Sequence, residues 1–84
     1  MSEIKIFKTI GILGGMGPEA TADLFHHIIR LTPASTDADH IPIIINNQPG
    51  IPDRSDYILS RGPSPVPQLI DGAKKLEEWG ADFI

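Results

Sequence analysis

The chain has 84 residues, enough for one small domain but near the lower limit at which a single hydrophobic core supports itself. Its net charge is −4 without any cluster of Lys or Arg, which argues against nucleic acid or acidic membranes as partners. It contains no cysteine, so disulfides, thiolate metal sites and thiol chemistry are excluded within these residues. No apolar run reaches the length of a signal core or a membrane span, and we expect a cytoplasmic location.

The first predicted elements are a strand at residues 8–13 and a helix that begins at Pro18, joined by a glycine-rich turn. Glycines carry no Cβ, so the backbone N–H groups of the turn can approach a ligand closely. Pro18 suits the first position of a helix, and a helix N-terminus favours anions. On the glycines alone, a tight turn without a ligand is an equally good interpretation.

The amphipathic helix ends at Thr32-Pro33, because proline disfavours the helical conformation of the residue before it. Residues 41–45 form an apolar, β-branched run that predicts a second strand, with Pro42 indicating an edge position. Residues 46–64 lack sustained periodicity, apart from one helical turn near Tyr57. A connection of this length in a compact domain is usually functional or disordered.

A second helix is predicted from Ser64-Pro65 to Gly80, and residues 81–84 begin a third strand. This pattern predicts an α/β fold in which a three-stranded parallel sheet with two helices has strand order 2-1-3. Because the last strand is short and apolar, we interpret residues 1–84 as the front part of a longer, doubly wound domain.

Nucleotide binding is one alternative, since residues 15–20 match the pattern G-x-G-x-x-A after a strand. That fingerprint needs an acidic residue at the end of the second strand, where this chain has Asn46-Asn47-Gln48. A P-loop is excluded, because no lysine occurs between Lys8 and Lys74.

Arg54 is the main candidate for binding an anion, with Arg61 as a second. Arg54 follows the second strand, and the carboxyl ends of parallel strands meet at one edge of the sheet, beside the glycine turn. A guanidinium group binds a carboxylate through two parallel hydrogen bonds. The alternative is a local ion pair of Arg54 with Asp53 or Asp56 in a solvated loop.

The histidines do not form a recognisable metal or catalytic site. His26 and His27 are adjacent and point about 100° apart on a helix, which makes a shared metal ion implausible. His40 lies in a predicted loop without a partner nearby in the sequence. We therefore assign no metal, cofactor or catalytic residue within the chain.

Several motifs together resemble the amino-terminal part of the aspartate/glutamate racemase family, whose members work without pyridoxal phosphate. They are Gly11-Ile12-Leu13-Gly14-Gly15-Met16-Gly17-Pro18, Asn47-Gln48-Pro49, Ile51-Pro52-Asp53-Arg54 and Gly80-Ala81-Asp82-Phe83-Ile84. The resemblance implies a flavodoxin-like racemase domain, followed in the family by a second domain that is absent here. It also implies two catalytic cysteines on opposite faces of the substrate, both outside these residues.

By the same resemblance, the residues that bind the substrate are Met16, Asn47, Gln48 and Arg54, and the substrate is aspartate or glutamate. The full-length protein is expected to be a homo-oligomer, and these residues alone are expected to be an inactive fragment. A nucleotide-binding fragment and a non-catalytic module that binds an anion or a protein remain as alternatives.

Overall fold

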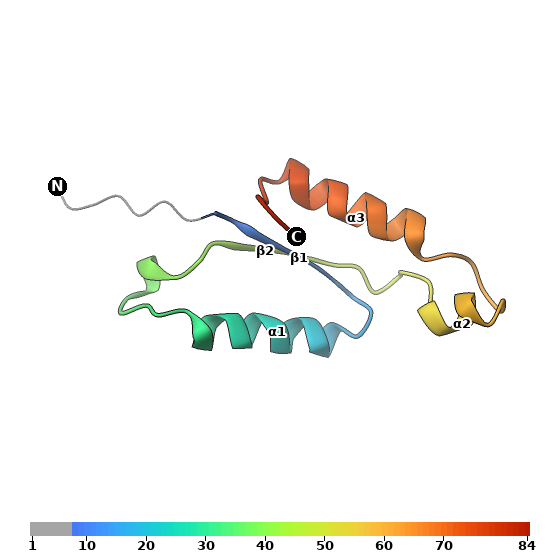
Figure 1. The fold of residues 1–84 in the computed structure, drawn as a ribbon, viewed down its shortest axis with the longest axis horizontal. Helices are drawn as coiled ribbons and strands as arrows, with labels where there is room; N and C mark the ends of the chain where they lie inside the picture. The colour runs from blue at the N-terminus through green and yellow to red at the C-terminus, as the bar shows by residue number, and fades with distance from the viewer. Residues whose placement is uncertain (1–7) are drawn as a thin grey trace.

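The computed structural model describes residues 8–84 and has an α/β fold. In chain order the elements are β1 (Ile10–Gly14), α1 (Pro18–Leu31), the 3-10 helix η1 (Asp37–Asp39), β2 (Ile43–Asn47), α2 (Arg54–Ile58) and α3 (Val66–Glu78). β1 and β2 form a two-stranded parallel sheet that runs between α1 and α3 (Figure 1). This confirms the predicted α/β class and the parallel pairing of the first two strands.

Helix α1 has the bounds that the sequence predicts. Gly17 is its N-cap and Pro18 its first residue, and at the other end the hydroxyl of Thr32 donates to the carbonyl of Ile28 at 2.6 Å. β2 begins and ends two residues later than predicted. The reason is its register with β1, which pairs Leu13 with Asn46 and Gly14 with Asn47, so two polar residues join the ladder.

The predicted third strand does not form as a strand. Residues 81–84 make a single parallel bridge between Ile10 and Phe83, with Gly11 N–H donating to the Phe83 carbonyl at 2.7 Å. So short a segment makes too few ladder bonds to count as a strand. Ile10 also pairs with Ile43, so β1 does lie between β2 and this segment, as the order 2-1-3 requires.

The helical turn predicted near Tyr57 is a short helix, α2, which begins earlier than expected, at Arg54. A carboxylate oxygen of Asp53 accepts hydrogen bonds from the backbone N–H groups of Ser55 at 2.6 Å and Asp56 at 3.3 Å. Such an N-cap satisfies donors that a helix start leaves free. Local capping therefore produces a helix without long-range periodicity.

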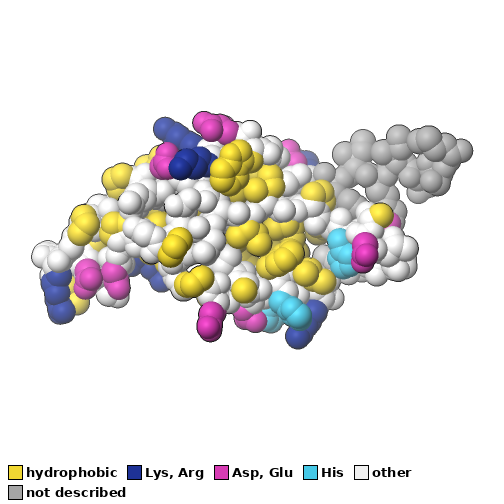
Figure 2. All heavy atoms as spheres, turned by 180° about the vertical axis from the view of Figure 1, so that it is seen from behind, with side chains coloured by type: hydrophobic (Ala, Val, Ile, Leu, Met, Phe, Trp, Pro, Cys, Tyr) yellow, Lys and Arg dark blue, Asp and Glu magenta, His cyan; other side chains and the backbone are white. Residues whose placement is uncertain are grey.

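The hydrophobic core of the described residues is small. Leu76 of α3 is fully buried and Ile12 of β1 is 6% exposed, whereas no residue of α1 is buried. Figure 2 shows hydrophobic side chains gathered across the middle of one face, with charged side chains toward its margins. None of the helices in residues 8–84 combines the length and apolar character needed to cross a membrane.

Candidate functional site

The candidate site lies where both strands end, because β1 and β2 are parallel and their carboxyl ends share one edge of the sheet. β1 leads into the glycine turn and α1, and β2 leads through residues 48–53 into α2. The two connections meet there: the Gln48 N–H donates to the Gly14 carbonyl at 2.8 Å. The sheet thus brings together segments that are more than thirty positions apart in the chain.

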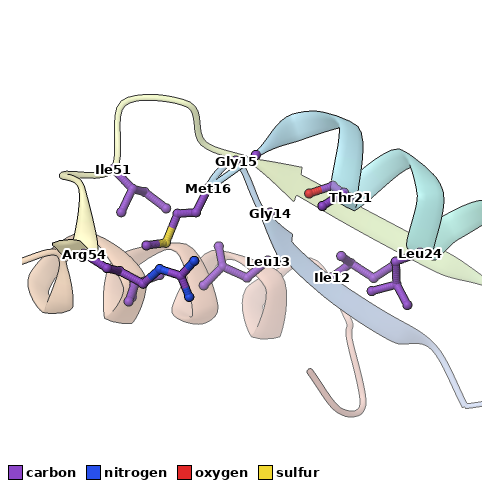
Figure 3. Close-up of a pocket in the computed structure, with 12 residues that line it drawn as sticks. Ile12, Leu13, Gly14, Gly15, Met16, Thr21, Leu24, Ile51 and Arg54 are labelled. Carbon is purple, nitrogen blue, oxygen red and sulfur yellow. The ribbon is translucent and has the colours of Figure 1, made fainter.

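A pocket of about 270 Å³ opens at this edge. Its wall is mostly apolar, and the side chains that define it include Met16, Thr21, Leu24, Ile51, Arg54 and Leu69. Met16 and Arg54 also line an adjoining hollow formed with residues 51–55. Figure 3 shows the side chain of Arg54 extending from α2 toward Met16 and Leu13. Apolar walls with a single charged group are typical of sites that orient a small anionic ligand.

Arg54 is the charged side chain that lines the pocket of about 270 Å³. Within residues 8–84 no ion pair or hydrogen bond engages its side chain. Neither local acidic residue takes up the guanidinium, since Asp53 caps α2 and no ion pair with Asp56 forms within the described residues. The guanidinium donors are therefore available to a ligand in the pocket.

Gly15 fixes the shape of the turn that borders the pocket. Its φ is 119°, a conformation that other residues rarely adopt. A Cβ on Gly15 would also overlap the backbone of Gln48. The glycine is therefore required for the close approach of the two connections, beyond any role in making a turn.

The predicted site residues do not all line the pocket. Met16 and Arg54 do, whereas Asn47 and Gln48 are not among its lining residues. Asn47 is exposed at the end of β2. Gln48 is half-buried, and its side-chain amide donates to Asn46 at 2.6 Å.

Asn46 is 4% exposed and was not among the predicted site residues. Its side-chain amide donates to the carbonyl of Gly72 in α3 at 3.2 Å. Its position in the sequence was the signal that could have indicated its burial, because Asn46 directly follows an apolar strand run. If the strand continues through such a polar residue, its side chain needs hydrogen-bond partners in the interior.

Other candidates lie away from this pocket. Arg61 is exposed and is not among the residues that line it. His27 contacts Asp23 one turn earlier on α1, and His40 lines a separate hollow with Ile41 and Ile43. In the part of the chain that the structure describes, no cluster of three His, Asp or Glu side chains is placed to hold a metal ion.

Comparison with known proteins identifies the family. The sequence profile of the Asp/Glu/hydantoin racemases matches residues 13–84, which is most of the chain. The chain belongs to this racemase family. The matched range begins on β1 and includes the glycine turn, Arg54 and α3, so every wall of the pocket lies within it apart from Ile12.

Two known racemases are similar to the chain in sequence or structure. The broad specificity amino-acid racemase RacX of Bacillus subtilis (strain 168) is 38% identical over 79 residues, covering 89% of this chain and 34% of RacX. The structure of the aspartate racemase of Picrophilus torridus superposes with a TM-score of 0.82 at 40% identity, covering 89% of this chain and 32% of that one. The chain therefore spans about a third of the length of these relatives.

Proposed function

We propose that the protein racemises an acidic amino acid, aspartate or glutamate, by two-base proton transfer without pyridoxal phosphate. Racemisation removes the α-proton on one face of the carbon and returns a proton on the other. It therefore needs two acid/base groups on opposite sides of the substrate. Membership of the racemase family supports the reaction class, and the relative from Picrophilus torridus is an aspartate racemase.

The observation that carries the proposal is the unpaired guanidinium of Arg54 beside Met16 in the pocket at the sheet edge. In our proposal it binds a carboxylate of the amino acid through a charge-assisted hydrogen bond. Met16 and Ile51 supply apolar contacts next to it. Asn47, exposed at the adjoining end of β2, is proposed to donate a hydrogen bond to the substrate. Gln48, whose side-chain amide donates to Asn46, is proposed to contribute to substrate binding through that contact.

The catalytic acid and base are proposed to lie outside residues 1–84. Within the pocket lining, Arg54 is the ionisable side chain, and an arginine stays protonated and is a poor base. We propose that residues 1–84 form part of an amino-terminal α/β domain and that a second domain completes the active site. The assembled protein is proposed to be cytoplasmic, to act in amino-acid metabolism and to form a homo-oligomer.

Replacement of Arg54 tests the proposal in the full-length racemase that carries this sequence. Loss of a hydrogen bond to a charged group costs about 1.5–3 kcal/mol, so Arg54→Ala should lower kcat/KM for L-aspartate or L-glutamate about ten- to a hundredfold. Arg54→Lys should restore only part of this loss, because lysine keeps the charge but lacks the planar fork. Steady-state rates of racemisation, measured by circular dichroism, give kcat/KM for both variants.

Arg61→Ala is the matched control. It removes an exposed cation from the same connection without touching the pocket, and kcat/KM should stay close to that of the parent. If Arg54→Ala stays within twofold of the parent, Arg54 does not bind the substrate and the proposed site is wrong.

A further inference from the structure

Asn46 is the buried polar side chain among the residues that the structure describes. Burial of an amide is costly unless its hydrogen bonds are satisfied. Here both ends are engaged: Nδ2 donates to the Gly72 carbonyl at 3.2 Å, and Oδ1 accepts from the Gln48 side chain at 2.6 Å. The Asn46 side chain thus connects α3 to the residue that follows β2.

On α3, the contact is made by Gly72. A Cβ at Gly72 would lie 2.6 Å from Cδ1 of Leu13 and 3.5 Å from Nδ2 of Asn46. Gly72 is buried in the middle of α3, where glycine is an unfavourable helix residue. Its lack of a side chain leaves room for Leu13 of β1, and its carbonyl is within hydrogen-bond reach of Asn46.

Gln48 links Asn46 to the residues that line the pocket. Its N–H donates to the Gly14 carbonyl at 2.8 Å, and its carbonyl accepts from the Ile51 N–H at 3.3 Å. Its backbone also packs directly on Gly15. Gly14, Gly15 and Ile51 all line the pocket, so the position of the Gln48 peptide sets the position of three lining residues.

We propose that Asn46 is a positioning residue for the pocket. The Asn46 side chain is anchored to Gly72 of α3 and binds the Gln48 side chain. It thereby holds the Gln48 backbone against the glycine turn, which positions Met16 and Ile51. The inference about the local geometry stands on the hydrogen bonds, while its importance for substrate binding rests on the proposed function.

Amide hydrogen exchange tests the geometry independently of any ligand. The quantity to measure is the exchange rate of the amide at position 48 divided by that of the Ile10 amide, which donates to Pro42 at the other end of the sheet. Global unfolding exposes both amides, so the ratio reports on the local hydrogen bond alone. We expect Asn46→Ala to raise this ratio about tenfold, the usual effect of a lost hydrogen bond.

Other variants separate the positioning role from general stability. Gln48→Leu removes the same hydrogen bond from a half-buried position and should raise the ratio similarly, even if Asn46→Ala does not fold. Asn46→Asp keeps the acceptor for Gln48 and should raise the exchange ratio less than Asn46→Ala does. Leu76→Val thins the core without touching these hydrogen bonds and should leave the ratio unchanged. An unchanged ratio in Asn46→Ala, or in Gln48→Leu, overturns the inference.

Binding of L-aspartate then shows whether the positioning matters for the site. Its affinity is measured from the shift of the Met16 amide resonance during a titration. We expect Asn46→Ala to weaken binding about tenfold and Leu76→Val to leave it unchanged, whereas equal affinity in Asn46→Ala and the parent would overturn the role in binding. If the full-length parent binds neither L-aspartate nor L-glutamate, the proposed function fails, and the exchange ratio alone decides the inference.

Discussion

Gly15 holds the connection between β1 and α1 against the end of β2. Its φ is 119°, which would strain the backbone of an alanine, and the Cβ of that alanine would overlap the backbone of Gln48. We expect Gly15→Ala to lower the free energy of unfolding by about 1–3 kcal/mol, measured by urea denaturation followed by far-UV circular dichroism.

Gly50→Ala is the control for Gly15→Ala, because a Cβ at Gly50 would meet no atom within 4 Å and its φ is not positive. It should change the free energy of unfolding by less than about 0.5 kcal/mol. Equal urea midpoints for the two variants would show that the turn tolerates a side chain and that its close packing is not required.

Single residues differ in how far the sequence predicts their roles. Arg54 could be predicted to lie beside the glycine turn, because a strand end and a parallel sheet determine its place. The burial of Asn46 could not, since its partner Gly72 is 26 positions away and the contact depends on how α3 packs. The same packing explains why Gln48 turns toward Asn46 and does not line the pocket.

Among the elements, β1 has an edge that is only partly covered. It pairs with β2 on one side but on the other meets only the Phe83 bridge, and an apolar groove there is lined by Leu24, Ile28 and Ile84. Open strand edges with apolar surroundings favour pairing between chains. We expect the purified chain to self-associate as its concentration rises, measured by analytical ultracentrifugation.

A lysine placed at this edge should oppose self-association. Ile84→Lys adds the charge within the groove and should shift the chain toward the monomer. Ile58→Lys adds the same charge at a site on α2 that is 77% exposed and outside the groove, and should have little effect. A parent that stays monomeric at all concentrations and melts sharply would contradict the account of the edge.

Local signals predicted the bounds of elements where the signals were strong, and predicted them only in part where packing or capping determines the bounds. The Pro18 start and Thr32-Pro33 stop gave the bounds of α1, whereas β2 extends through Asn46 and Asn47 because β1 provides hydrogen-bond partners. Helix α2 depends on the cap from Asp53, a signal too short to show periodicity. Residues 81–84 lie beside β1 as predicted but form only a bridge.

At the scale of the whole molecule, the described residues supply one side of a site. The pocket has Arg54 as the proposed carboxylate anchor and apolar side chains in Met16 and Ile51, but its lining contains no Asp, Glu, His or Lys that could act as a base. His26 and His27 lie on α1, outside this pocket. Chemistry that needs bases on both faces of the substrate therefore requires groups from elsewhere.

The most direct measurement follows the α-protons of L-aspartate and L-glutamate by NMR while each is incubated with the 84-residue chain in D₂O. Racemisation by proton transfer replaces the α-proton with deuterium, so loss of its signal reports the chemical step. We predict no exchange above a buffer blank, because we propose that the acid and base lie outside these residues. Exchange clearly above the blank that Arg54→Ala abolishes would contradict the account, since it would show that this pocket alone carries out the chemistry.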